Sequence, residues 1–270
     1  MTTAAPAEIE GSVVDGAWQL TDRATRAAEV TIRPATPTDV TGVQELLSTV
    51  WGPAQRLQSN LLQALSHAGA TVAAAMRDGV AVGACVGFLG WSGGVHLHSH
   101  MAAVRDGHRT TGVGYALKLW QRAVCLEHGI DEIRWTFDPL VRRNGYFNLA
   151  KLGARVVDYL PDFYGEMDDI VNAGDRSDRF EVSWSLVGAD EGAFGAVRPD
   201  GAPDRAVGDR FVALPEDYET LRREDPFAAR QWRDQARAEI AAHWDDGLRP
   251  VWAPGGYSFR SGGGHGGTGD

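Results

Sequence analysis

Lysine, cysteine and long apolar runs are scarce in this chain of 270 residues. Only Lys118 and Lys151 are lysines, and every other basic residue is an arginine. The 26 Lys and Arg residues are outnumbered by 36 Asp and Glu, which leaves a formal net charge of −10. A general nucleic-acid binder normally carries a basic face, so we expect no nucleic-acid partner. The bias towards Arg and Ala indicates a bacterial genome of high GC content.

The two cysteines, Cys85 and Cys125, lie in apolar segments and lack metal-ligand spacing. They exclude a disulfide framework and favour buried thiols. No run approaches the roughly 20 apolar residues of a membrane-spanning helix, and residues 1–30 lack the pattern of a signal peptide. We therefore expect a cytoplasmic protein with no membrane partner. A composition with 43% hydrophobic and 23% charged residues is typical of a globular protein.

The chain divides by composition into a long structured part with poorly patterned ends. Residues 1–29 are rich in Ala and Thr, and residues 261–270 are rich in Gly, so we expect a flexible N-terminal extension and a disordered tail. Residues 188–208 have the composition of a linker. We predict a main domain over 30–187 and a C-terminal extension over 188–260 that packs on it.

Hydrophobic periodicity predicts the element order β-α-α-β-β-β-α-β-α-β-β over the main domain. Asp78-Gly79 separates two strand-like runs and is a strong hairpin signal, because Gly accepts the positive φ of a tight turn. A third strand, Val95–Val104, is followed by an amphipathic helix over Thr111–Glu127. In the extension, the pattern predicts a strand at Phe211–Leu214 and helices at 215–223 and 226–244.

The segment from Val104 to Tyr115 carries the clearest chemical signal. It joins a strand end, a Gly-containing loop and a helix start, so unpaired N–H groups and the positive helix end meet at one point that favours anions. Gly112 and Gly114 let a diphosphate approach the backbone, and Arg109 adds a positive charge. The segment matches neither the P-loop nor the dinucleotide fingerprint. A capped helix with packing glycines is the plainer alternative.

The spacing Arg109-x-x-Gly112-x-Gly114 resembles the acyl-CoA-binding motif of the Gcn5-related N-acetyltransferase (GNAT) superfamily. The element order is also similar to the GNAT core, and the sequence resembles a subgroup of predicted acetyltransferases with a C-terminal extension. The resemblance implies an α/β fold of the α+β type. Its sheet would be mixed and mostly antiparallel, with helices on both faces and splayed central strands. It implies that the coenzyme is held by the following residues: Ala102, Ala103, Val104, Arg109, Thr110, Thr111, Gly112, Val113, Gly114, Tyr115, Asn144 and Asn148.

Three histidines alternate along the strand before the loop. His96, His98 and His100 are expected to project to one face with Ala102 and Val104. One interpretation is a metal site, although adjacent side chains on one strand face lie about 6–7 Å apart, which is long for a shared ion. Structural histidines are another. The third is catalysis, because an amine must lose a proton before it attacks a thioester.

The resemblance to GNAT enzymes places the candidate base at His98, with His100 second. It also implies direct acyl transfer in a ternary complex, in which the Ala102 N–H polarises the thioester carbonyl. The slot in which many family members hold an acidic Tyr contains Leu149 here. Tyr146 is a candidate substitute. A half-buried aromatic in a helix is the alternative for that residue.

We therefore expect an acyl-CoA-dependent N-acyltransferase that uses acetyl-CoA or another acyl-CoA, such as succinyl-CoA, and no metal. The acceptor would be a primary amine of a small molecule. Arg179, beside Asp178, favours an amino-acid-like acceptor, unless the two residues form an internal ion pair. A non-catalytic CoA-binding module and a metalloprotein built on His96, His98 and His100 remain alternatives. A homodimer is also left open.

Overall fold

The computed structural model describes residues 9–53, 56–165, 175–187 and 210–261, which form two compact units. The first unit contains the described residues up to Trp135 together with 185–187. The second contains 136–165, 175–184 and 210–261. The division therefore falls at residue 135 and not at residue 188, where the sequence composition changes. Each unit is described by itself.

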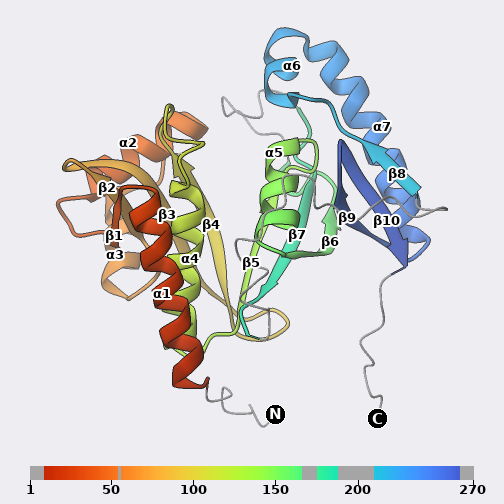
Figure 1. The fold of residues 1–270 in the computed structure, drawn as a ribbon. Helices are drawn as coiled ribbons and strands as arrows, with labels where there is room; N and C mark the ends of the chain where they lie inside the picture. The colour runs from red at the N-terminus through yellow and green to blue at the C-terminus, as the bar shows by residue number, and fades with distance from the viewer. Residues whose placement is uncertain (1–8, 54–55, 166–174, 188–209, 262–270) are drawn as a thin grey trace. The chain divides into compact units, whose positions relative to one another are not determined.

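The first unit is an antiparallel sheet with helices on both faces (Figure 1). Its strands follow the order β1-β2-β3-β4-β5, antiparallel except for the parallel pairing of β4 with β5. Asp78 and Gly79 both have positive φ in the β2–β3 turn, which confirms the predicted hairpin. Its elements, in chain order, are α1 (Gly11–Ala27), β1 (Thr31–Pro34), α2 (Val40–Trp51), α3 (Ser59–His67), β2 (Ala73–Arg77), β3 (Val80–Gly90), β4 (His96–Val104), α4 (Val113–Glu127) and β5 (Glu132–Phe137), whose last two residues belong to the second unit.

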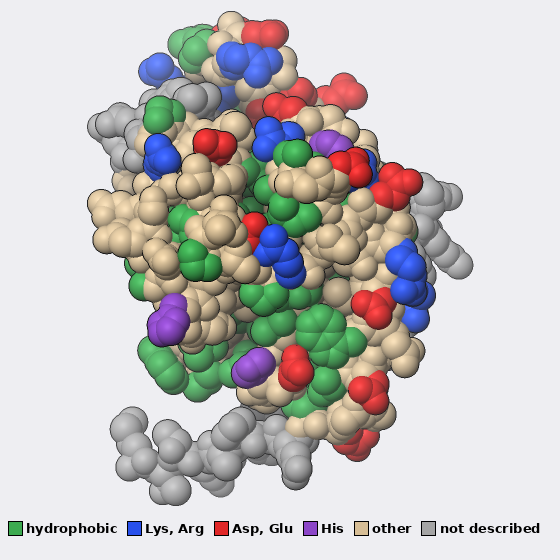
Figure 2. All heavy atoms as spheres, turned by 90° about the vertical axis from the view of Figure 1, so that its left-hand side faces the viewer, with side chains coloured by type: hydrophobic (Ala, Val, Ile, Leu, Met, Phe, Trp, Pro, Cys, Tyr) green, Lys and Arg blue, Asp and Glu red, His purple; other side chains and the backbone are tan. Residues whose placement is uncertain are grey.

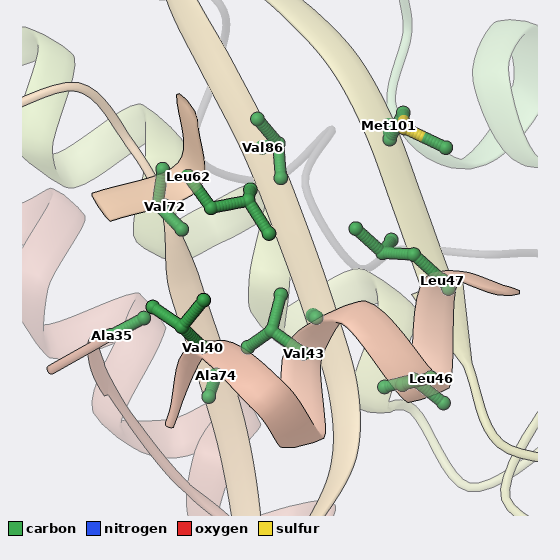
Figure 3. Packing of buried hydrophobic residues seen from close by; sticks show 12 residues of the cluster. Ala35, Val40, Val43, Leu46, Leu47, Leu62, Val72, Ala74, Val86 and Met101 are labelled. Atoms are coloured by element: carbon green, nitrogen blue, oxygen red, sulfur yellow. The ribbon is translucent and has the colours of Figure 1, made fainter. Parts of the chain in front are cut away.

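Two apolar clusters cover opposite faces of this sheet. Ala74 packs in the cluster beneath α2, whereas its neighbours Ala73 and Ala75 pack in the cluster beneath α4. Alternate residues of a strand point to opposite faces, so this division follows directly from the pleat. Figure 3 shows the first cluster, in which α2 places Val43, Leu46 and Leu47 towards the strands.

The N-terminal segment is largely helical, so the expectation that residues 1–29 form a flexible extension is wrong over the described part. α1 buries Ala17 and Thr21 and contacts α4, beside which it runs in Figure 1. Ala28 and Trp18 join the cluster formed by Val113, Leu117 and Trp120 of α4. Small residues let two helices approach closely, and Ala and Thr give only a weak hydrophobic signal in the sequence.

The second unit combines the rest of the predicted main domain with the C-terminal extension. β6 pairs antiparallel with β7, and β8, β10 and β9 form a separate antiparallel sheet in that order. The β9–β10 hairpin turns at Pro254-Gly255 and is absent from the predicted elements. The elements are α5 (Arg142–Gly145), the π-helix η2 (Tyr146–Lys151), β6 (Arg155–Leu160), β7 (Arg179–Ser185), β8 (Arg210–Ala213), α6 (Tyr218–Glu224), α7 (Pro226–Asp245), β9 (Leu248–Ala253) and β10 (Gly256–Ser261).

These pairings confirm the predicted class of fold, a mixed and mostly antiparallel α/β arrangement. The last helix of the predicted element order is present as α5 and η2, and most of it is a π-helix. The extension packs on residues 136–165 of its own unit, where the Tyr257 hydroxyl donates a hydrogen bond to the carbonyl of Pro139 at 2.8 Å. The predicted linker 188–208 lies outside the described residues, and so does the predicted tail except Ser261.

Candidate active site

The loop between β4 and α4 leads directly into a helix start. Gly112 is the N-cap of α4 and has φ +88°, a left-handed conformation that glycine adopts without strain. The first backbone bond of the helix runs from the Ala116 N–H to the Gly112 carbonyl. The N–H groups of Val113 and Gly114 therefore lie in the first turn, where a helix itself supplies no acceptor.

The start of α4 lies close to the end of β4 and to the end of α1. A Cβ built at Gly114 would lie 3.6 Å from Cγ2 of Val104, and one built at Gly112 would lie 3.8 Å from Cβ of Ala28. Thr111 turns the chain into the helix, since both its N–H and its hydroxyl donate to the carbonyl of His108, at 3.2 and 2.8 Å. The predicted coenzyme residues 102–104 and 109–115 are thus gathered at one strand-to-helix junction.

Arg109 lies on the surface of this loop. It forms an ion pair with Asp106 at 3.0 Å, and the two side chains are 46% and 87% exposed. Exposed pairs of this kind contribute little to stability, so the guanidinium is free to exchange its partner for a phosphate. On the face shown in Figure 2, Lys and Arg side chains are scattered among Asp and Glu.

Arg77 ties the loop to the C-terminal end of α1, a contact that sequence patterning did not reveal. Its guanidinium donates to the carbonyls of Ala28 and Glu29 and lies 3.3 Å from Nδ1 of His108. It also pairs with the Glu29 carboxylate at 3.5 Å. Arg77 is at the end of β2, 31 residues before His108, so only the fold brings the two together.

A β-bulge in β4 alters the expected placement of the histidines. Val86 of β3 pairs with Met101 and Gly87 pairs with Ser99, which leaves His100 as the extra residue. Ser99 bonds to Gln121 of α4, whereas Met101 packs in the cluster beneath α2. The two side chains thus point to opposite faces although they are two residues apart.

The prediction that all three histidines share a face with Ala102 and Val104 is therefore wrong. Val104 packs in the cluster beneath α4, the same side as Ser99, while His98 projects from the other side of the strand. The bulge inserts one residue and shifts the alternation by one position. No hydrophobic pattern marks a bulge at this place in the sequence.

His96 stands apart from the other two histidines. It is buried, its Nδ1 lies 2.9 Å from the carbonyl of Gly94, and its ring covers Gly90, where a Cβ would come within 2.5 Å of Nε2. Gly90 is opposite His96 in the β3–β4 ladder. His96 therefore has the role of a structural histidine that closes the hairpin.

His98 and His100 form an aromatic group with Phe88 of β3. The ring centroids of His98 and His100 are 6.1 Å apart, and Phe88 lies 5.3 and 5.8 Å from them. Burial, followed by the nearby His100, His96 and Lys118, lowers the pKa of His98 to about 4, and burial also lowers the pKa of His100. Both rings are neutral at pH 7, a form that accepts a proton.

The remaining predicted site residues belong to the second unit. Tyr146 begins the π-helix and packs edge-on against Trp252 of β9, with centroids 5.8 Å apart. Asn148 is buried in the same π-helix, and Asn144 is half-buried in α5. These contacts match the alternative interpretation of Tyr146, in which it is a half-buried aromatic residue of a helix. The proposed roles of the three residues towards a coenzyme stay predictions.

Ion pairs of the second unit use Asp138 and Asp178, the second of which lies beside the residue suggested for acceptor binding, Arg179. Asp138 accepts two bonds from Arg233 of α7, at 2.9 and 2.6 Å, and Asp178 pairs with Arg237. The Arg179 guanidinium donates to the backbone carbonyl of Asp178 at 2.8 Å and not to its carboxylate. The suggested Asp178–Arg179 ion pair is thus replaced by Asp178–Arg237, which the sequence separates by 59 positions.

Within the described residues, no three His, Cys, Asp or Glu side chains come together as metal ligands would. The described part of the chain therefore contains no ligand set that would support a metalloprotein built on His96, His98 and His100. In the same part, every helix is too short or too polar to cross a lipid bilayer.

No protein-family model matches this chain, and no curated protein matches it. Several solved structures have a similar fold. Naa50 of Arabidopsis thaliana, in complex with the bisubstrate analogue CoA-Ac-MVNAL, is 21% identical with a TM-score of 0.48, over 58% of this chain and 98% of that chain. The ribosomal-protein-S18-alanine N-acetyltransferase of Escherichia coli is 13% identical with a TM-score of 0.48, over 60% and 97%.

A third similar structure is the diaminobutyrate acetyltransferase EctA of Paenibacillus lautus, in complex with L-2,4-diaminobutyric acid and coenzyme A. It is 19% identical with a TM-score of 0.47, over 59% of this chain and 97% of that chain. Two of the three are named as acetyltransferases. Likeness at these identities concerns the fold and not the substrate.

Proposed function

We propose that this protein is an acyl-CoA-dependent N-acyltransferase of the GNAT type that transfers an acetyl or other short acyl group to a primary amine of a small molecule. The observation that supports this most is the left-handed Gly112 at the start of α4, directly after β4. There, the N–H groups of Val113, Gly114 and Tyr115 would hold the diphosphate of the coenzyme, and Arg109 would add a charge-assisted contact.

In this proposal, the amine attacks the thioester carbonyl while β4 supplies the groups around it. The Ala102 N–H stabilises the oxyanion, and His98, or His100 beside it, accepts the proton of the amine. A base with a pKa of about 4 is too weak to deprotonate a free alkylammonium ion at equilibrium. We therefore propose that the amine arrives uncharged and that proton transfer accompanies formation of the C–N bond, after which the CoA thiolate leaves.

Calorimetric titration with acetyl-CoA and succinyl-CoA tests the coenzyme site. Gly112→Trp places a large side chain over the N–H groups and should weaken binding by about 100-fold or more. Gly69→Trp is the matched control, because Gly69 also has positive φ (+82°) and open space at its Cβ. Both variants carry similar backbone strain, so only loss of the binding site distinguishes them.

Wild-type protein that is folded and binds neither donor would overturn the proposal. Binding without turnover would instead support the non-catalytic module. Thiol release with a panel of small amines and with a panel of peptides that have free N-termini then distinguishes the two kinds of acceptor. His98→Asn should lower turnover and leave acetyl-CoA affinity within about twofold, because His98 lies in β4, outside the 109–115 loop.

A further inference from the structure

Lys118 is a buried lysine that forms no ion pair with a carboxylate of the described residues. It lies in the middle of α4 and is only 5% exposed. Its ammonium donates to the Ser99 hydroxyl at 2.8 Å and lies 3.9 Å above the ring of Trp135 in β5. Lysine is almost never fully buried unless it is paired, and here a hydroxyl and an aromatic face take the place of the usual acid.

Lys118 starts a chain of hydrogen bonds that reaches across the sheet. Ser99 donates to Oε1 of Gln121 at 2.8 Å, and Nε2 of Gln121 donates to the Thr71 hydroxyl at 3.0 Å. All four side chains are buried. The three hydrogen bonds link four buried side chains in series, and a connected buried network of this kind favours one arrangement of the groups that form it.

This chain is located at the β4 bulge. Ser99 pairs with Gly87, and a Cβ at Gly87 would come within 2.5 Å of the Thr71 hydroxyl and 3.0 Å of Nε2 of Gln121. Glycine there leaves the space that the network fills. Ser99 is flanked by His98 and by the extra residue His100, so fixing the Ser99 side chain fixes the backbone that carries both imidazoles.

We propose that Lys118 is a positioning residue that holds the β4 bulge through Ser99 and so orients His98 and His100 for the acyl-transfer reaction. The reaction rests on the proposed function, whereas the coupling of Lys118 to the two imidazoles does not. α4 would then serve the site at two places, with its first turn for the coenzyme and with Lys118 one and a half turns further along for the candidate base.

The electrostatic surroundings make this coupling measurable. Burial lowers the pKa of Lys118 to about 7, and the groups that face it are the thiols of Cys85 in β3 and Cys125 in α4. Lys118 is also among the groups that lower the pKa of His98. Burial raises the pKa of both thiols to about 12, so they stay neutral when Lys118 titrates. Neither thiol ionises to offset the charge of Lys118, so removing that charge should change the pKa of His98.

The small number of lysines allows a direct test by NMR. In Lys151→Arg, Lys118 is the only lysine, and 15N labelling of lysine gives one side-chain amine signal. We expect it to titrate near pH 7, about three units below an exposed lysine. Signals of His98 and His100, assigned with His98→Asn and His100→Asn, should change in Lys118→Met, and the titration midpoint of His98 should rise because a nearby positive charge is removed.

Ser99→Ala is the second variant, because it removes the contact from the strand side if Lys118→Met does not fold. It should also shift both imidazole signals. The double variant Lys118→Met/Ser99→Ala should shift them no further than the larger of the two single variants, because both substitutions break the same hydrogen bond. Lys151→Met, a lysine in the second unit, is the control and should leave them in place. Folded Lys118→Met and Ser99→Ala with unchanged imidazole signals would overturn the proposal. Failure of wild type to bind acyl-CoA would overturn the proposed function alone.

Discussion

At the scale of single residues, His98 should make the stability of the fold depend on pH. Its pKa is about 4 in the folded protein and about 6.5 when unfolded. Above pH 6.5 both states are neutral and the full stability is present. As the pH falls from 6.5 towards 4, the unfolded chain takes up a proton that the folded protein resists, so stability decreases, by about 2 kcal/mol.

Urea unfolding at pH 7.5 and pH 4.5 measures this effect. His98→Phe keeps an aromatic ring beside Phe88 and removes the titration, so it should lose about 2 kcal/mol less than wild type between the two pH values. His67→Phe, at an exposed position of α3, should lose as much as wild type. Equal losses in wild type and His98→Phe would show that His98 does not titrate as described.

Which residues carry the candidate site was visible in the sequence, but how they are oriented was not. Gly112, Gly114 and the strand before them were singled out by spacing and residue type, because glycine at a helix start lets an anion approach the backbone N–H groups. The side on which His98 projects depends on one extra residue in β4, and a bulge leaves no trace in hydrophobic alternation. Lys118 was likewise seen only as part of an amphipathic helix.

At the scale of elements, α1 depends on small side chains where it meets α4. Ala17 is 1% exposed in that contact. Ala17→Leu adds three carbon atoms to a packed contact and should destabilise the protein by about 1–3 kcal/mol. Urea unfolding measures the change, with Arg23→Leu as the control.

Arg23 is exposed on the same helix, so Arg23→Leu should stay within about 0.5 kcal/mol of wild type. A cost for Ala17→Leu no larger than that of Arg23→Leu would mean that α1 does not pack closely on α4. The contact also concerns the site, since Ala28 at the end of α1 lies beside Gly112 and Arg77 joins this end to His108.

Elements with strong periodicity were predictable, and elements with weak periodicity were not. α7 was predicted as 226–244 and is observed as Pro226–Asp245, because Pro marks its start and apolar residues recur at helical spacing. α1 was missed because its buried face is made of Ala and Thr. β9 was missed because Pro250 interrupts a strand pattern, and this is tolerated there since β9 is an edge strand next to β10.

At the scale of the whole molecule, compositional boundaries and structural boundaries differ. The Gly- and Asp-rich segment after residue 187 suggests that one domain ends there. The division instead falls in β5, and about the last third of the predicted main domain shares a unit with the extension. Composition shows where a chain is polar, whereas a compact unit is defined by contacts between distant segments. The arginines of α7 make such contacts, as ion pairs with the Asp residues 138, 175 and 178.

The second unit should depend on Arg233 more than on any surface charge of α7. Arg233 is 1% exposed and bridges Asp138 and Asp175, at 2.6 and 2.9 Å. Burial by itself raises the pKa of Asp138, and Arg233 offsets this so that the pKa is lowered and the carboxylate stays charged. Arg233→Ala leaves two buried carboxylates poorly compensated, because Arg222 approaches them only to 3.7 and 3.6 Å. The expected loss is about 3–5 kcal/mol.

Urea unfolding together with amide hydrogen exchange in β6, β7 and α7 tests this dependence. Arg230→Ala, at an exposed position of α7, is the control and should change stability by less than about 0.5 kcal/mol. Arg233→Met with Asp138→Asn should recover part of the loss, because it removes a charge from each side of the pair and leaves fewer uncompensated groups. A cost for Arg233→Ala no greater than that for Arg230→Ala would mean that the buried pair adds nothing to the unit. The C-terminal extension would then be held by its other contacts, among them the Tyr257–Pro139 hydrogen bond and the Arg237–Asp178 ion pair.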